Sequence, residues 1–303
     1  MRRLVIWVLL ITLGVALPVL PHALDWFNTR VHAGTMSASS QAISHLSDDE
    51  TAGILAAAEQ YNRDLVHAIT GRSSELSEEY LDQLNVPGTD VMAKVAVPSV
   101  GITIPIFHGT ADDTLYRGAG HQYGTSLPVG GTNTHAVITA HSGLARHRLF
   151  TDLHDVVKGD LFSITAAGRV LWYEVDQILV VEPGDIEELR VQGGKDLVTL
   201  FTCTPTGVNS HRLLVRGHRT EAPGDMDGSF FTQVDAGFPW WAAVVTSAAM
   251  ASTFTGKRLF IPARPASAGE AGISGSETGD ESALEALTPP HVSHLQLDDE
   301  VRR

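Results

Sequence analysis

Residues 196–219 predict two β-strands joined by a tight turn, which commits this part of the chain to a sheet. Residues 197–202 are β-branched and apolar, a composition typical of a strand buried on both faces. Pro205, Gly207 and Asn209 follow within a few residues, and each of these residue types favours a turn. Residues 212–216 predict the second strand, which we expect Gly217 to end.

Cys203, the one cysteine in 303 residues, lies where the first of these strands meets the turn. A hairpin would bring it close to Arg212 at the start of the second strand. A single cysteine cannot form an internal disulfide, so it is either buried and inert or kept for chemistry. A guanidinium near a thiol favours the reactive thiolate. The hairpin therefore predicts a reactive site.

Short strand patterns separated by turn residues recur through the middle of the chain. They cover residues 94–107, 134–140, 161–165, 170–175 and 177–182, with one short strand expected within residues 118–131 and a short helix at residues 149–157. Many short strands of this kind predict a mostly β fold, a closed and largely antiparallel barrel. The strand at residues 134–140 delivers His141 at its end.

Charge and motif content exclude several classes of function. The formal net charge is −14, whereas a nucleic-acid-binding protein needs a basic face. The 14 histidines form no H-E-x-x-H motif, and their spacings do not match those of zinc sites. The glycine-rich segment at residues 118–131 lacks the G-K-[ST] ending of a phosphate loop. We therefore expect no cofactor, no metal and no nucleic-acid partner.

Two segments without charged side chains flank the predicted barrel. The first lasts to residue 24, follows Arg2 and Arg3, and is long enough to cross a bilayer as an uncleaved helical anchor. A cleaved signal peptide is the alternative, and either one exports the residues that follow. The second segment, residues 236–256, contains two tryptophans and ends at a Lys–Arg pair, which predicts a crossing back to the cytoplasm.

The other boundaries follow from composition and helix signals. Ser47 and Glu50 have the spacing of a capping box, and apolar residues at helical spacing predict a helix at about residues 48–70, with a shorter one near residues 75–84. The predicted organisation is an anchor or signal segment at residues 1–24, a linker at 25–47, a helical segment at 48–90, a barrel at 91–221, a linker at 222–235, a transmembrane helix at 236–256 and an acidic, disordered tail at 257–303.

Several motifs resemble those of the sortases. Residues 199–203 match the T-L-x-T-C signature of that family, and residues 209–217 resemble the segment that follows it in class C, pilin-polymerising sortases. The resemblance continues in family order through residues 104–109, 120–131, 139–144 and 149–153, and so covers about residues 92–219. It implies an eight-stranded β-barrel, in agreement with the strand pattern.

The resemblance also implies a cysteine transpeptidase. Cys203 would attack the threonine carbonyl of an LPXTG-like signal to form a thioester, His141 would transfer protons, and Arg212 would stabilise the oxyanion. Thr202 is a candidate for orienting the substrate. The implied partners are pilins or surface proteins that carry the signal and a pilin lysine that accepts the acyl group. The catalytic domain would be extracellular and both termini cytoplasmic.

Two departures from class C bear on specificity. Class C enzymes usually carry a lid over the active site, often with an Asp-Pro-aromatic plug, and residues 48–90 contain no such tripeptide. The helices of this segment either form a differently built lid or simply pack on the barrel. Thr206 stands where many relatives have a bulkier residue, which leaves the fine specificity open.

Three alternative functions remain open. A housekeeping-type sortase would attach surface proteins to a cell-wall precursor, and a plain cysteine protease would result if water attacked the thioester. A non-catalytic sortase-like membrane protein would use the barrel for binding or assembly. The combination of Cys203, His141 and Arg212 argues against the last alternative, because a binding module needs none of these residues.

Overall fold

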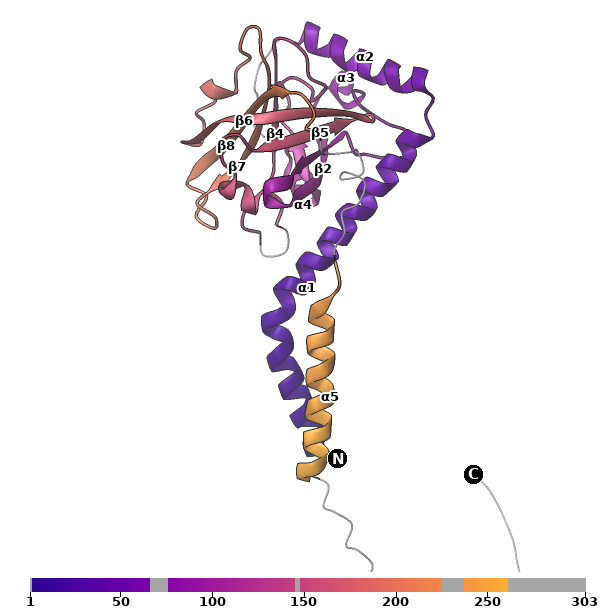
Figure 1. The fold of residues 1–303 in the computed structure, drawn as a ribbon, viewed down its shortest axis with the longest axis vertical. Helices are drawn as coiled ribbons and strands as arrows, with labels where there is room; N and C mark the ends of the chain where they lie inside the picture. Colours follow the sequence, from indigo (N-terminus) through magenta and orange to yellow (C-terminus); the bar gives the residue numbers. More distant parts are fainter. Residues whose placement is uncertain (1, 66–75, 145–147, 225–236, 261–303) are drawn as a thin grey trace, which may run out of the picture. The chain divides into compact units, whose positions relative to one another are not determined.

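The computed structural model describes residues 2–65, 76–144, 148–224 and 237–260 (Figure 1). Its helices are α1 (Arg2–Ser44), α2 (Asp48–Asp64), α3 (Glu78–Leu81), α4 (Asp112–Arg117) and α5 (Trp240–Phe260), with 3-10 helices η1 (Pro98–Val100), η2 (Thr151–Asp155) and η3 (Glu187–Leu189). Its strands are β1 (Ala93–Val97), β2 (Ile102–His108), β3 (Ala119–His121), β4 (Thr134–Thr139), β5 (Leu161–Ala166), β6 (Arg169–Val181), β7 (Asp196–Thr204) and β8 (His211–Thr220). α2 ends at Asp64 and Leu65 is extended, so the helix expected to reach about residue 70 is shorter than predicted. Most of the second linker and nearly all of the tail lie outside the described residues.

The described strands close into one barrel in the order β1-β2-β3-β4-β7-β8-β6-β5, and β5 pairs with β1 to complete the ring. This confirms the mostly β, eight-stranded barrel expected from the sequence. The β2–β3 and β4–β7 pairs are parallel, and the other described pairs are antiparallel. Alternate residues fill the interior, among them Ile138 of β4 and Val198 and Leu200 of β7.

β6 is one long strand, although the sequence predicts two. The chain passes Asp176 in a bulge and then resumes its pairing with β8. Arg216 of β8 donates to both carboxylate oxygens of Asp176, at 2.9 and 3.0 Å, so the bulged residue has a charged partner. The interruption in the strand pattern at residue 176 therefore marks a bulge rather than a strand end.

Gly217 does not end β8, which continues to Thr220, so that expectation is wrong. A Cβ at Gly217 would lie only 2.4 Å from Cε1 of Phe162 and 3.0 Å from Cβ of Tyr173. The rings of Phe162 and Tyr173 stack with their centroids 5.5 Å apart. Glycine is needed at this position because a neighbouring ring lies against the backbone, not because the chain turns.

α1 continues through the segment expected to be a linker. It extends beyond the apolar residues to Ser44, so the predicted linker at residues 25–47 is wrong for most of its length. Residues 25–44 contain no proline and one glycine, Gly34, so little opposes propagation of a helix that has already formed. The expected capping box then starts α2: the Glu50 N–H donates to the Ser47 hydroxyl at 3.2 Å, and the Ser47 N–H donates to the Glu50 carboxylate at 2.8 Å.

α5 packs antiparallel beside α1 (Figure 1). The ring of Trp241 lies 5.9 Å from that of Trp26 and 5.7 Å from that of Phe27. Toward the other end of the pair, a Cβ at Gly256 would lie 2.4 Å from Cδ1 of Leu4. Within the described residues, α1 is the one helix that is long and apolar enough to cross a membrane by length and composition. The crossing expected at residues 236–256 stays a prediction.

α2 packs on the end of the barrel where β4 begins. The Asn62 amide donates to the Leu127 carbonyl at 3.1 Å, and the Leu127 N–H donates back to Asn62 at 2.7 Å. Glu59 forms an ion pair with Arg169, at the start of β6, over 2.6 Å. β4 and β7 carry His141 and Cys203 at their opposite ends. α2 thus packs on the barrel, which is the second of the two alternatives given for this segment. Residues 66–75 of the lid-like segment lie outside the described residues.

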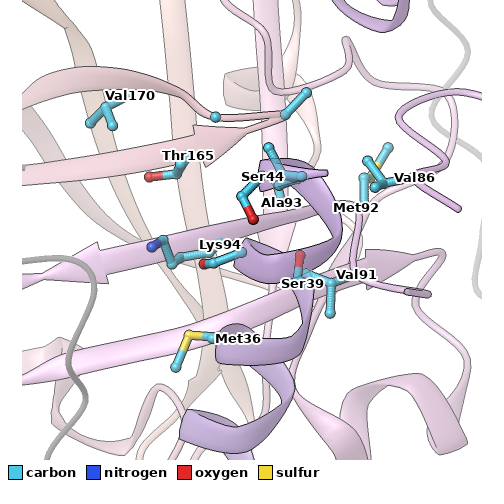
Figure 2. Close-up of a pocket in the computed structure, with 14 residues that line it drawn as sticks. Met36, Ser39, Ser44, Val86, Val91, Met92, Ala93, Lys94, Thr165 and Val170 are labelled. Carbon is cyan, nitrogen blue, oxygen red and sulfur yellow. The ribbon is translucent and has the colours of Figure 1, made fainter. Parts of the chain in front are cut away.

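A cavity of about 340 Å³ lies between the last turns of α1 and the barrel (Figure 2). Met36 and Ser39 line it from α1, and Lys94 and Thr165 line it from β1 and β5, where the two residues are cross-strand neighbours. Burial lowers the pKa of the Lys94 ammonium. Residues from the expected linker are therefore part of the folded structure.

Candidate active site

His141 lies immediately beyond the end of β4, beside the last residues of β7. The two strands run parallel, and their register ends with Thr139 opposite Phe201. One further backbone hydrogen bond joins the two segments, from the Ala140 N–H to the Phe201 carbonyl at 3.1 Å. Continued by two residues, this register would bring His141 opposite Cys203.

Arg212 lies on the other side of Cys203. β7 and β8 are antiparallel, and their register pairs Cys203 directly with Arg212. Residues that are directly opposite across a sheet carry their side chains on the same face. His141, Cys203 and Arg212 therefore form one row across three adjacent strand ends, with the cysteine in the middle. We refer to these three residues as the reactive row.

The reactive row lies on the outer face of the barrel. Val198 and Leu200 belong to the interior, so the alternation of side chains along β7 puts Cys203 outside, next to Phe201. An apolar cluster continues from the row on the same face and includes Val137 and Leu214, with Leu189 of η3 packed against them. These three side chains are at most 4% exposed, so η3 covers this part of the outer face.

Cys203 is a half-buried free thiol, and Arg212 is held against the turn that follows it. Nη1 of Arg212 donates to the carbonyl oxygens of Asn209 and His211, both at 3.0 Å. A guanidinium has five N–H donors, so the others remain for a ligand as far as the described contacts of Arg212 go. A cation held in this way can donate to an oxygen anion that forms at a carbonyl attacked by the thiol.

Thr202 does not share a face with the reactive row. It is 2% exposed, and its hydroxyl donates to the Ala140 carbonyl at 2.8 Å. Because Thr202 alternates with Cys203 along β7, its side chain lies on the barrel side of the strand. The substrate-orienting role suggested for Thr202 stays a prediction, and the contact made by its hydroxyl is with the main chain next to His141.

Ser142, the residue after His141, makes a contact that the sequence does not predict. Its side chain is 7% exposed, and its hydroxyl donates to the carbonyl of Cys203 at 2.5 Å. The contact joins residues 61 apart in the sequence. A serine after a histidine carries no local signal of such a contact, so the fold was needed to find it.

His121 is paired with the core residue Ile138 and His108 with His121, so both histidines are on the inner side of the barrel, opposite to the face of the reactive row. Burial lowers the pKa of His121 to about 4 and also lowers that of His108. Nδ1 of His121 lies 2.9 Å from the Tyr80 hydroxyl, and Nε2 of His108 lies 2.7 Å from the Gln83 carbonyl. Both histidines thus have packing roles. Across the described ranges, no three His, Cys, Asp or Glu side chains are arranged to hold a metal ion.

The profile of the sortase domain matches residues 95–220, which contain the barrel and the whole reactive row. The crystal structure of sortase C-1 from Actinomyces oris is 43% identical to this chain and superposes with a TM-score of 0.55, covering 57% of this chain and 99% of that one. The chain belongs to the sortase family. This sortase is also similar to the structure described as a pilus-related sortase C of Group B Streptococcus, with 42% identity and a TM-score of 0.57 over 62% of this chain and 97% of that one.

Similarity to curated proteins is more limited in extent. The sortase is 33% identical over 117 residues to Sortase A of Streptococcus agalactiae serotype III (strain NEM316), which is 38% of this chain and 47% of that protein. The chain therefore spans about half the length of this curated relative. Sortase C structures and a Sortase A sequence are both among its relatives, so family membership does not by itself assign a class.

Proposed function

We propose that this sortase is a class C cysteine transpeptidase that cleaves an LPXTG-like signal between Thr and Gly and transfers the acyl part to a lysine amine of a pilin subunit. The observation that carries the proposal is the reactive row at the ends of β4, β7 and β8. In the proposed roles, the nucleophile Cys203 lies between a group that can transfer protons, His141, and a permanent cation, Arg212. Acyl transfer through a covalent intermediate needs these three functions together.

In the first half-reaction, the thiolate of Cys203 attacks the threonine carbonyl carbon, and the carbonyl π electrons move to the oxygen. The guanidinium of Arg212 stabilises the resulting oxyanion. The oxyanion then collapses, the bond between the carbonyl carbon and the glycine nitrogen breaks, and the His141 imidazolium gives its proton to that nitrogen. The products are a thioester on Cys203 and a peptide with a free glycine amine.

In the second half-reaction, a lysine amine attacks the thioester carbonyl. His141, now neutral, takes a proton from this amine, and Arg212 again stabilises the oxyanion. The C–S bond breaks, an isopeptide bond remains, and Cys203 leaves as the thiolate. The charges of the starting site are restored, so no cofactor is consumed.

The choice of a pilin lysine as acceptor rests on the similarity to the pilus-related sortase C structure. Similarity to Sortase A favours a second candidate, in which the acceptor is an amine of a cell-wall precursor. The two candidates share the thioester on Cys203 and differ only in the amine that resolves it. Acceptor choice is therefore the step that separates them.

The proposed setting is the outer surface of a membrane, with α1 and α5 crossing as an antiparallel pair. The charged Arg2 and Lys257 lie toward one end of this pair, and Trp26 and Trp241 meet toward the other. Basic residues on the cytoplasmic side and tryptophans at the interfaces are the usual pattern of membrane helices. In a Cys203→Ala background, the exposed residue of a Lys195→Cys variant is expected to react with an impermeant maleimide in intact cells; protection until the cells are permeabilised would contradict this topology.

The proposed reaction is tested by intact-mass spectrometry of the full chain in lipid nanodiscs. Incubation with an LPXTG peptide is expected to add the mass of the acyl fragment, and the single cysteine assigns the adduct to Cys203. Cys203→Ala is the matched control, since it should fold normally and acquire no mass. An adduct of the same size on the alanine variant would refute the assignment of the nucleophile.

Acceptors are added after the thioester has formed. Transfer to the lysine of a pilin fragment, with little transfer to short glycine peptides, is the result expected for class C. Transfer only to glycine or peptidoglycan-like amines would favour the cell-wall candidate, and release by water alone would favour a protease. The absence of any adduct with the wild-type chain would contradict the proposed substrate.

A further inference from the structure

The backbone pairing of β4 with β7 stops before it reaches the reactive row. Its last bond runs from the Ala140 N–H to the Phe201 carbonyl at 3.1 Å. Bonds in a parallel ladder alternate regularly between the two strands. The next two would use the carbonyl of Ala140 and then that of Cys203 as acceptors. Ala140 directly precedes His141 in the chain, and Cys203 is across from it on β7. The partners of these two carbonyls therefore affect where the histidine sits.

Both carbonyls receive a hydrogen bond from a side-chain hydroxyl. Thr202 donates to the Ala140 carbonyl at 2.8 Å, and Ser142 donates to the Cys203 carbonyl at 2.5 Å. Both residues are almost fully buried, at 2% and 7% exposure. The two bonds run in opposite directions between the two segments: Thr202 donates from β7, and Ser142 donates from the segment after β4. Together they extend the connection between these segments past His141.

We propose that Ser142 is a positioning residue that fixes His141 beside Cys203. The Thr202 hydroxyl supports the same segment from β7 through its bond to the Ala140 carbonyl. The inference deepens the proposed function, because it concerns how the same site is assembled. β4 ends at Thr139, two residues before His141, and the His141 carbonyl accepts from the Phe150 N–H at 3.1 Å. The Ser142 hydroxyl is the link that ties this segment directly to the main chain of the proposed nucleophile.

The segment after His141 also lies close to the turn after Cys203. Gly143 has φ of +71°, and a Cβ there would be 2.5 Å from Cγ2 of Thr206 and 3.2 Å from the nitrogen of Gly207. The Gly143 N–H donates to the Thr151 hydroxyl at 3.0 Å. The Ser142 bond is therefore at the centre of a close contact between the two loops that carry His141 and Cys203.

Removal of the Ser142 hydroxyl is expected to slow thioester formation more than it weakens substrate binding. The Cys203 carbonyl would lose a donor, and the segment that carries His141 would lose one of its hydrogen bonds to β7. A displacement of about 1 Å in a reacting group can cost roughly 10²-fold in rate. We expect Ser142→Ala to lower the acylation rate by about that factor while KM changes less than threefold. Ser142→Thr keeps a hydroxyl and is expected to retain most of the rate.

Ser126→Ala is the matched control for the loss of a buried serine hydroxyl. Ser126 is fully buried, and its hydroxyl accepts from the His135 N–H at 3.1 Å at the start of β4, away from the reactive row. This variant is expected to lose stability in urea while keeping the acylation rate. All variants are prepared as the full chain in nanodiscs, and their unfolding midpoints are measured beside their kinetics.

A second readout does not depend on the substrate. Because Cys203 is the only cysteine, the rate of its alkylation by iodoacetamide can be followed by intact mass across a range of pH. An imidazolium next to the thiol affects this pH profile of the alkylation rate. His141→Ala and Ser142→Ala are expected to change the profile in the same direction. Ser142→Thr and Ser126→Ala are expected to keep the wild-type profile.

The outcomes separate this inference from the proposed function. If the wild-type chain forms no thioester with the LPXTG peptide, the proposed substrate fails, and the alkylation profiles still test the positioning role. A folded Ser142→Ala variant with wild-type acylation and alkylation would overturn the inference. It would also be overturned if Ser126→Ala slowed acylation as much as Ser142→Ala, or if His141→Ala left the alkylation profile unchanged.

Discussion

Lowering the pH from 7 to 4 is expected to destabilise the barrel through the buried side chain of His121. The ring is fully buried, with Nδ1 2.9 Å from the Tyr80 hydroxyl and Nε2 2.8 Å from the Ser126 carbonyl. A neutral ring fits these partners, because Nε2–H can donate to the carbonyl while Nδ1 accepts from Tyr80. The Tyr80 oxygen already accepts from the Gly109 N–H at 3.0 Å. A second ring proton, on Nδ1, would disrupt this network.

The expected loss of stability follows from the two pKa values of His121. Burial lowers the pKa to about 4 in the folded chain, against 6.5 for an unperturbed histidine. Between these values the unfolded chain binds a proton that the folded chain does not, so stability falls as the pH falls. The contribution is fully present above pH 6.5, and about 3 kcal/mol is lost by pH 4. Globular domains are stable by only about 5–15 kcal/mol, so the loss is large.

Urea unfolding of the full chain in detergent micelles at pH 7, 6, 5 and 4 measures this effect. Trp172 reports on the barrel if the four helix tryptophans are replaced by phenylalanine. His121→Gln is the control: it should be less stable at pH 7, but it should lose about 3 kcal/mol less on acidification. Burial also lowers the pKa of His108, and that contribution cancels in the comparison. Equal losses in the two proteins would refute the reasoning.

Two further predictions concern the reactive row and the barrel packing. Arg212→Lys keeps the charge but changes the donor geometry, so acylation should slow by about 10²-fold with little change in the urea midpoint. Unaltered acylation would contradict the oxyanion role. Gly217→Ala should cost about 1–3 kcal/mol in urea unfolding, because its Cβ would lie 2.4 Å from Phe162. Gly193→Ala, whose Cβ would meet nothing within 4 Å, is the matched control, and equal losses would contradict the packing argument.

Local sequence patterns located the two strands that precede His141 and Cys203. Short runs rich in apolar and β-branched residues predicted both strands, because each run is bounded by turn residues. The same reasoning failed at Gly217 and Asp176. A glycine or an acid within a strand pattern predicts an interruption only if nothing distant packs against it. Here Phe162 lies over one residue, and Arg216 binds the other.

The helical parts show the same limit. Residues 33–44 look like a linker when their small and polar side chains are considered alone, but no residue type there stops α1. Two helices were expected in the segment at residues 48–90, and α2 and α3 are both shorter than their expected ranges. Their place on the barrel does not follow from the sequence. The contacts of Asn62 with Leu127 and of Glu59 with Arg169 decide that place, and they join residues 65 and 110 positions apart.

The sequence by itself determined the class of fold and the chemical groups available to the site, because strand periodicity, turn residues and a single cysteine are local features. It also named Cys203, His141 and Arg212 through motifs that resemble those of the sortases. Only the tertiary structure decided that these residues form one row, since this depends on the parallel register of β4 with β7 and the antiparallel register of β7 with β8. The bond from Ser142 to the Cys203 carbonyl belongs to the same class of information: it arises when two chain segments 61 residues apart are brought side by side.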